Sequence, residues 1–376
     1  MSSRKVYFPN LHGLRFIAAF LVIIHHTEQI KGMSGIDNYF LDSSFISEIG
    51  HHGVNLFFVL SGFLITYLLL VEEKEFKLIN IKNFYVRRIL RIWPLYFLIV
   101  IFSFFILPKI FIFDLYGSSK LDIFSDFYKK IALYLIFLPN LAMSMSFFVP
   151  YASHLWSIGT EEQFYLIWPI LFRFFKNSKL LVMCLIVFLY STIKILLGSQ
   201  IVSEIPYIKI IENFWQTFSI DSMAIGGIYA LIYFYKMQIR NYFLNIYLFY
   251  LVLFFTLVLI ILGCNLGNFH NQFFSILYGL IILNLSLNEF SKINLENKIF
   301  IFLGNISYGL YMYHPIGIKI GLLLGVFLGL KTNFFFYPAI LGITVLISTI
   351  SYKYFESYFL GFKNKFSNIK SGSSGF

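Results

Sequence analysis

The chain has 376 residues, of which 59% are hydrophobic, 21% aromatic and only 12% charged. A soluble domain carries about 25% charged residues, so this composition excludes an ordinary globular protein and indicates a membrane protein. The net charge of +11 does not indicate nucleic-acid binding, because the basic residues lie mainly between apolar segments, where they orient a membrane protein and meet anionic lipid.

Apolar runs recur along the whole chain, each of roughly 18–20 residues, which is enough for a helix to cross ~30 Å of hydrocarbon. The sequence therefore predicts an all-α fold, a polytopic membrane helix bundle of about ten transmembrane helices. The predicted spans are 11–29, 53–70, 92–108, 156–172, 180–198, 219–235, 242–262, 272–288, 299–323 and 334–352.

The distribution of basic residues predicts the orientation of these spans. Nineteen of the 29 Lys and Arg residues fall on the side of the N-terminus, seven on the opposite side and three within spans. Because cytoplasmic loops are enriched in Lys and Arg, this bias predicts that both termini are cytoplasmic. We therefore expect a multi-pass protein of the inner (cytoplasmic) membrane of the cell.

One further apolar stretch, 131–149, does not fit this count, because a crossing there would turn the basic tail outward. Pro139 lies in its middle, where it suits a break in a helix. We therefore expect an external re-entrant or interfacial segment within 109–155. The transmembrane domain is predicted over residues 1–362, followed by a basic, flexible cytoplasmic tail over 363–376.

The first span begins with LHGLRFIAAFLVIIHHTE over 11–28 and contains residues that a simple anchor does not need. Arg15 and His26 are eleven residues apart, so they share one helix face about 16 Å apart along the axis, whereas His25 is turned by about 100°. Charged residues within spans usually face an interior cavity. The alternatives are that Arg15 reaches the cytoplasmic headgroups and that His26 is an interfacial residue.

The second span contains Ser61 and Gly62, in GVNLFFVLSGFLIT over 53–66. A glycine at this place favours close approach of a neighbouring helix. Ser61 is a candidate for contact with the backbone or with an acyl chain, and an acyl-serine intermediate is the alternative. A serine nucleophile needs a dedicated base, and the sequence indicates none for Ser61.

Three arginines, Arg87, Arg88 and Arg91, stand at the cytoplasmic start of the third span, in FYVRRILRIWPLYF over 84–97. Arg87 and Arg91 share a helix face and Arg88 lies beside it. They are either anchors of the positive-inside kind or a cradle for phosphates, which Arg binds with paired, charge-assisted hydrogen bonds.

The fourth span begins within HLWSIGTEEQFYLIWP over 154–169, which holds two adjacent carboxylates. Glu161 shares a helix face with Tyr165, one turn later. A glutamate near a helix N-terminus is also favoured by the helix dipole, without any further role. Trp156, Ser157 and Tyr165 are additional candidate site residues.

A later block, ISYGLYMYHP over 306–315, places His314 directly before Pro315 within a predicted span. His314 is either a packed polar residue or a further site residue. The eight histidines and two cysteines lack metal-ligand spacing such as H-x-x-x-H or C-x-x-C, so we expect no metal site.

Taken in order, these blocks resemble the acyltransferase-3 family of integral-membrane O-acyltransferases, of the type that O-acetylates surface polysaccharides. The first helix of that family carries LDGLR and, after ten further residues, a histidine; here LHGLR is followed by FIAAFLVIIH and then His26. A last block, ISYKYFES over 350–357, extends the resemblance over essentially the whole chain. The chain departs from the family pattern at His12, where Asp is usual, and at Ser219, where Arg is often found.

The resemblance implies transfer of an acetyl (acyl) group from cytoplasmic acyl-CoA, in the first place acetyl-CoA, to a hydroxyl of a cell-surface or lipid-linked carbohydrate. It implies that His26 is the general base, that Glu161 holds its imidazole and that Arg15 guides the donor. The residues expected to bind the phosphates of the donor are Arg15, Arg87, Arg88 and Arg91.

The expected partners are the lipid bilayer, acyl-CoA and the carbohydrate acceptor, with no nucleic acid; a homo-oligomer stays open. The main alternative function is a secondary transporter, which would predict inverted repeats with broken helices, and we find no such repeat. Two narrower alternatives are a small non-glycan acceptor and a succinyl donor. Direct transfer and a transient acyl-enzyme are equally open.

Overall fold

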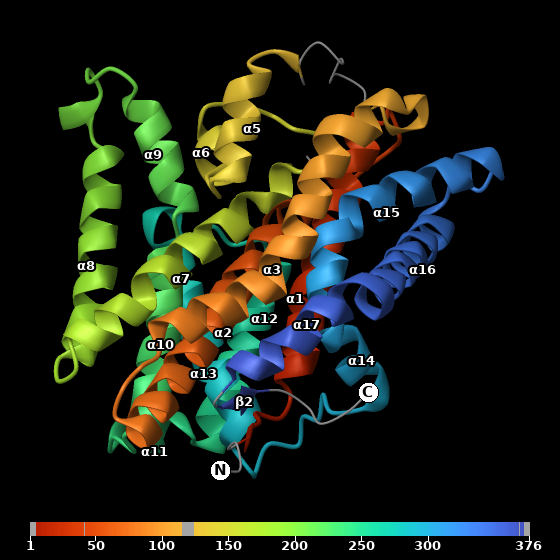
Figure 1. Ribbon diagram of the computed structural model, residues 1–376. Coiled ribbons are helices and arrows are strands. Elements are labelled where there is room, and N and C mark those ends of the chain that lie inside the picture. The colour runs from red at the N-terminus through yellow and green to blue at the C-terminus, as the bar shows by residue number, and fades with distance from the viewer. Residues whose placement is uncertain (1–4, 41, 115–123, 368, 372–376) are drawn as a thin grey trace.

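The computed structural model describes residues 5–40, 42–114, 124–367 and 369–371. In these ranges the chain forms an all-α membrane bundle (Figure 1). The long helices are α1 (Leu11–Met33), α2 (Ser44–Phe76), α3 (Ile81–Ile101), α7 (Trp156–Phe174), α8 (Lys179–Leu197), α10 (Ile220–Phe234), α12 (Ile246–Ile261), α13 (His270–Leu287), α15 (Ser307–Phe327) and α16 (Asn333–Ser351). The shorter helices are α5 (Phe127–Leu135), α6 (Pro139–Ser144), α9 (Ile208–Thr217), α11 (Ile239–Phe243), α14 (Lys298–Asn305) and α17 (Ser357–Lys363).

Each predicted span overlaps one of the long helices. In the described part of the chain, six helical segments are long and apolar enough to cross a membrane, and they are Ser44–Phe76, Ile81–Lys109, Lys179–Leu197, Ile208–Phe234, Ser307–Phe327 and Asn333–Lys363. Charged and polar residues such as Arg15 in α1 and Glu161 in α7 lower the hydropathy of those two helices, and α12 has only 16 residues. The all-α, multi-pass architecture is thus confirmed, and the count of ten spans stays a prediction.

α2 is central to the bundle and packs on both α1 and α10. Its 33 residues extend over about 50 Å, more than the thickness of the hydrocarbon. Ser43 caps its start, where the side chain accepts a hydrogen bond from the Ile46 N–H. A Cβ atom at Gly62 would collide with the carbonyl oxygen of Met223 on α10. The predicted close approach of a second helix at Gly62 is therefore confirmed.

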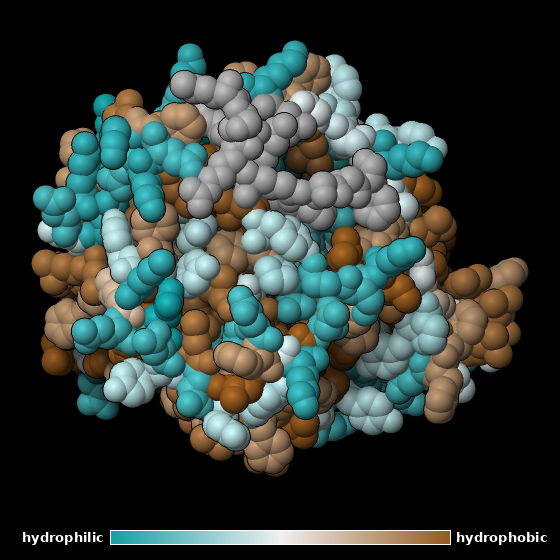
Figure 2. Space-filling view, turned by 90° about the horizontal axis from the view of Figure 1, so that it is seen from below, coloured by the Kyte–Doolittle hydropathy of each residue, from teal (hydrophilic) through white to brown (hydrophobic). Residues whose placement is uncertain are grey.

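Two short strands join the two ends of the described chain. β1 (Lys5–Val6) and β2 (Lys370–Ser371) pair in parallel at one end of the bundle, the lower end in Figure 1. Seen from this end in Figure 2, hydrophilic and hydrophobic side chains are interspersed over the face, with hydrophilic ones gathered at the upper left and a hydrophobic group projecting at the right rim. Because this pairing places both ends of the described chain at the same end of the bundle, it agrees with an even number of membrane crossings. That this end is cytoplasmic stays a prediction, and residues 372–376 of the predicted tail lie outside the described residues.

The stretch 131–149 is broken into two short helices. α5 ends at Leu135 and α6 begins at Pro139, and Phe137 between them has a positive φ of 59°. With nine and six residues, these helices are only about 14 Å and 9 Å long, too short to cross a bilayer. The external location of this segment stays a prediction, and 115–123 lie outside the described residues.

The predicted span 299–323 is not one continuous helix, because α14 and α15 are separated at Ile306. Gly304, at the end of α14, packs so closely on the backbone of His12 that no side chain would fit there. The Ser307 hydroxyl donates to the Gly304 carbonyl, at 2.8 Å. These contacts favour a break in the helix at this position, and they bring the start of α15 next to α1.

Candidate active site

A cavity of about 510 Å³ lies in the half of the bundle nearer to the two strands. Residues of α1, α2, α3, α7, α14, α15 and the C-terminal helices line it together. The charged residues of its wall are Arg15, Arg88, Arg91, Glu161, Glu356 and Lys363. Sequence positions as far apart as 15 and 363 therefore meet in one site.

The cations of this cavity have no ion-pair partner among the described residues. In the described ranges, the side chains of Arg15, Arg91 and Lys363 make no hydrogen bond or ion pair. The guanidinium of Arg88 lies 5.5 Å from the ring centre of Tyr165, and its Nε is buried without a hydrogen bond. Four cations face two carboxylates here, so the wall carries a surplus of positive charge. A buried, unpaired charge is unfavourable, so this wall is suited to an anionic ligand.

Arg87 lies apart from the other two arginines of its block. It forms an ion pair with Glu72 of α2, at 3.2 Å, and donates a second hydrogen bond to the carbonyl of Phe366, at 2.9 Å. The structure thus brings Arg88 and Arg91 together with Arg15 in the cavity wall, and it does not bring Arg87 there.

Glu161 belongs to a chain of hydrogen bonds inside the cavity. The Tyr165 hydroxyl donates to Glu161 Oε1 at 2.7 Å, and it lies 2.6 Å from the Ser61 hydroxyl. In the part of the chain that the structure describes, Glu161 makes no contact with His26. The predicted pairing of these two residues is therefore not found, and Glu161 instead faces Tyr165 and the cavity.

His26 is not among the residues that line the cavity, and it belongs to a cluster of histidines with His154 and His314. Its Nδ1 is 3.1 Å from the Val22 carbonyl and 3.2 Å from Nε2 of His314 on α15. The rings of His154 and His314 are 4.9 Å apart between centres. His25 points elsewhere, with its Nδ1 2.9 Å from the Ile46 carbonyl. The distinction between His25 and His26 that the helix geometry predicts is thus present.

Two hydroxyl groups lie between the cavity and the histidines. Ser157 and Tyr311 both line the cavity, and their oxygens are 2.6 Å apart. The Tyr311 hydroxyl donates to the carbonyl of His154 at 2.8 Å. Trp156 packs edge-on against Phe58, a wall residue, and so supports the cavity from behind.

Sequence reasoning missed several residues of this site. Glu356 and Lys363 reach the cavity from the C-terminal helices, and His154 and Tyr311 belong to the histidine cluster. Glu356, His154 and Tyr311 lie within sequence blocks that resemble the family, so the sequence contained a signal that could have identified them. Lys363 lies outside these blocks, and it reaches the cavity only because the fold packs α17 against α3.

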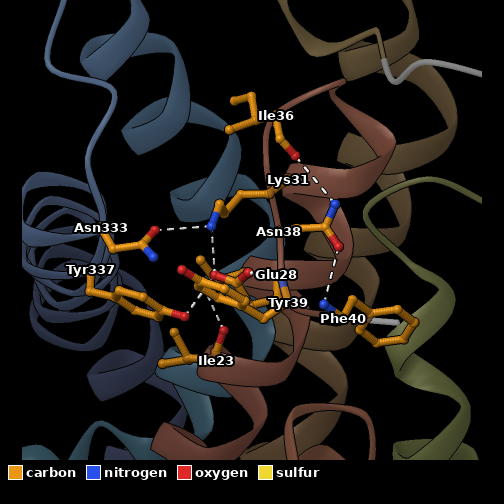
Figure 3. A network of polar contacts seen from close by, with 10 residues as sticks. Ile23, Glu28, Lys31, Ile36, Asn38, Tyr39, Phe40, Asn333 and Tyr337 are labelled. Carbon is orange, nitrogen blue, oxygen red and sulfur yellow. Dashed lines mark hydrogen bonds and ion pairs between the residues drawn. The ribbon is translucent and has the colours of Figure 1, made fainter. Parts of the chain in front are cut away.

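A second group of buried charges lies at the other end of α1 (Figure 3). Glu28 and Lys31 form an ion pair at 2.8 Å, and their side chains are 0% and 2% exposed. Glu28 also accepts hydrogen bonds from the Tyr337 hydroxyl and the Tyr39 N–H, both at 2.7 Å, and Lys31 donates to Asn333 at 3.0 Å. Every charge of this network has a partner, and it joins α1 to α16.

No group of three or more potential metal ligands from His, Cys, Asp and Glu is found where the structure describes the chain. The cavity and the histidine cluster present cations, hydroxyl groups and imidazoles. Such a set suits transfer of a group from an anionic donor with acid–base help.

Comparison with known proteins gives a family match over most of the chain. The family described as an acyltransferase domain matches residues 8–353. The peptidoglycan O-acetyltransferase OatA of Listeria monocytogenes is 35% identical over 188 residues, which are 48% of this chain and 27% of that protein. The O-acetyltransferase OatA of Staphylococcus aureus is 33% identical over 192 residues, 49% of this chain and 28% of that protein. The matches thus span only about a quarter of each relative. No solved structure matches the chain.

Proposed function

The chain belongs to the acyltransferase-3 family, whose domain covers residues 8–353, and on that premise we propose that it O-acetylates a surface carbohydrate. The protein is a multi-pass membrane acyltransferase. In the proposed reaction, an acetyl group moves from acetyl-CoA on the cytoplasmic side to a hydroxyl of a lipid-linked or cell-surface glycan. The names of the two relatives, both O-acetyltransferases and one of peptidoglycan, support the acetyl group and the glycan acceptor. We place the protein in the inner (cytoplasmic) membrane.

The cation-lined cavity is the observation that carries this proposal. Coenzyme A brings several phosphate charges, and Arg15, Arg88, Arg91 and Lys363 offer unpaired cations in one wall. Charge-assisted hydrogen bonds from Arg to phosphate are among the stronger contacts available. With the phosphates bound there, the long pantetheine arm has room to run past Ser61 and Tyr165 toward Tyr311.

The histidine cluster supplies the base in the proposed mechanism. The acceptor hydroxyl attacks the thioester carbonyl, so that a C–O bond forms and the C–S bond breaks. His26 takes the hydroxyl proton and returns it to the departing thiolate of coenzyme A, so that atoms and charges balance. The bound donor then extends along α1 over the distance of about 16 Å that separates Arg15 from His26. Direct transfer fits this separation better than an acyl group on Ser61, which lines the cavity with Arg15.

The test is acyl transfer in cells that lack the native gene and express variants of it. Acetate released by mild alkali from the envelope carbohydrate reports the product. Loss of a general base lowers the rate by about 10²–10⁴-fold, so His26→Ala should abolish the released acetate at a normal level of protein in the membrane.

His25→Ala is the matched control, because the His25 ring is held by the Ile46 carbonyl and packs edge-on against the His26 ring, but among the described residues it neither lines the cavity nor makes a hydrogen bond to His314. We expect most of the activity to remain in this variant. Full activity of His26→Ala, or a stronger defect in His25→Ala, would overturn the assignment of the base. Unchanged envelope acetate after deletion of the gene would overturn the acceptor class.

A further inference from the structure

We propose that His314 is a positioning residue that fixes the tautomer of His26 and so leaves Nε2 of His26 unprotonated as the base. The inference rests on the proposed function, because it takes His26 as the base. It replaces the carboxylate that the sequence suggested, Glu161, with a second imidazole.

Pro315 leaves one carbonyl of α15 without its usual hydrogen-bond donor. In an α-helix, the N–H of each residue bonds to the carbonyl four residues earlier, so the partner of the Tyr311 carbonyl would be the N–H of residue 315. Proline has no N–H. The Tyr311 carbonyl is therefore free inside α15, and Nδ1 of His314 lies 2.6 Å from it. Since a carbonyl can only accept, Nδ1 of His314 carries a proton and donates it.

The proton on Nδ1 of His314 determines the role of the other nitrogen of the same ring, Nε2. A neutral imidazole has one N–H and one nitrogen with a lone pair. With the proton on Nδ1, Nε2 of His314 is an acceptor. This Nε2 faces Nδ1 of His26 at 3.2 Å, so Nδ1 of His26 is the donor of that hydrogen bond.

A second contact fixes His26 in the same way. Its Nδ1 is 3.1 Å from the Val22 carbonyl, which again can only accept. Nδ1 of His26 thus donates to two acceptors, the Val22 carbonyl and His314. In the ranges that the structure describes, no carboxylate contacts either ring to stabilise an imidazolium ion, so both rings are neutral. The lone pair of His26 then lies on Nε2.

The state of Nε2 matches what a base needs. It makes no hydrogen bond to any described residue, and His26 is only partly buried, whereas His314 is 0% exposed. The partner on one ring nitrogen commonly decides what the other can do. In hydrolytic triads a carboxylate fixes the tautomer of the catalytic histidine. Here His314 fixes the tautomer of His26, and the tautomer of His314 is in turn fixed by the Tyr311 carbonyl that Pro315 leaves free.

The first measurement reads the tautomer directly. The protein is labelled with ¹⁵N-histidine, placed in lipid nanodiscs and studied by NMR, and the His26 signals are assigned by difference from His26→Ala. We expect an N–H at Nδ1 and a bare nitrogen at Nε2 in the wild type. In His314→Phe only the Val22 carbonyl remains as an acceptor for Nδ1 of His26, so we expect a mixture in which part of the His26 signal comes from the other tautomer. An N–H at Nε2 in the wild type would overturn the inference.

The second measurement compares two variants in acyl transfer. His314→Phe should lower kcat by at least about 10-fold, because part of the His26 population then has its proton on the wrong nitrogen. His314→Gln retains an acceptor at the same place and should recover much of that loss. The KM for acetyl-CoA should be unchanged in both, because the cations of the cavity are untouched.

The outcomes separate this inference from the proposed function. Wild-type kcat in His314→Phe, with His26→Ala inactive, would overturn the role of His314 alone. An equal loss in the Phe and Gln variants, with the tautomer unchanged, would mean that His314 only packs. Absence of acetyl transfer by the wild type would overturn the proposed function, while the NMR result would still test the tautomer.

Discussion

Both ends of α1 hold charges inside the bundle, but the charges are paired at one end and unpaired at the other. At one end, the Glu28–Lys31 network is complete, since each charge is paired and hydrogen-bonded (Figure 3). At the other end, Arg15 faces a cavity with three further cations, and none of the four forms an ion pair with a described residue. Removing one partner of a buried ion pair is strongly destabilising, whereas a charge that has no partner inside the protein is unfavourable until a ligand of opposite charge binds to it. We therefore distinguish two kinds of charge at α1: the paired charges of the Glu28–Lys31 network hold the helix in place, and the unpaired cations of the cavity are suited to binding an anionic substrate.

The same comparison applies to neighbours in one short block. Arg87 is paired with Glu72, whereas Arg88, one residue later, has a buried Nε with no hydrogen bond. The sequence predicts the same charge for these two arginines and places them on the same side of the membrane. They differ in the structure, where Arg87 has an ion-pair partner and Arg88 has none among the described residues.

The largest expected effect is on stability, at the paired end. Glu28→Ala leaves Lys31 buried without its carboxylate, and breaking a buried pair in this way typically costs about 3–5 kcal/mol. Thermal unfolding in detergent, followed by circular dichroism, measures the loss. The double variant Glu28→Gln with Lys31→Met removes both charges, and we expect it to regain most of the stability. Equal instability of the single and double variants would contradict the role of the ion pair.

A smaller effect is expected from Arg87→Ala. The side chains of Arg87 and Glu72 are 12% and 4% exposed, and Glu72 keeps a hydrogen bond from the Asn80 N–H in the variant, so the loss should be about 1.5–3 kcal/mol, that of one hydrogen bond between charged groups. The affinity for coenzyme A, measured by calorimetry, should stay within about twofold of the wild type. A larger fall in affinity would mean that Arg87 also reaches the donor.

The least perturbing prediction concerns which end of the bundle faces the cytoplasm. In a background with Cys184→Ser and Cys264→Ser, single cysteines replace Lys176 or Tyr128. An impermeant maleimide added to intact cells should label the cysteine at position 128 and not that at 176, because the positive-inside rule places 173–179 in the cytoplasm. Labelling of the opposite position would reverse the assignment of the donor cavity to the cytoplasmic side.

Much of the architecture could be predicted from the sequence, because long apolar runs have few alternatives in a membrane. The helical face shared by Arg15 and His26, and the turn of His25 away from it, also follow from α-helix geometry alone. The split of the arginine block could not be predicted, since it depends on Glu72, fifteen residues away on another helix. The pairing of His26 with His314 likewise joins positions that are 288 residues apart. The break at Ile306 depends on the tight contact of Gly304 with His12, which no local pattern contains.

The central claim is that the unpaired cations of the cavity hold the donor, and binding of coenzyme A tests it most directly. Two charge-assisted hydrogen bonds, each contributing about 1.5–3 kcal/mol, are lost in the double variant Arg88→Ala with Arg91→Ala. Calorimetry on the purified protein in nanodiscs should then find an affinity for coenzyme A at least about 100-fold weaker than that of the wild type, with Arg87→Ala close to the wild type. An unchanged affinity in the double variant, with thermal unfolding showing that it is folded, would contradict the account.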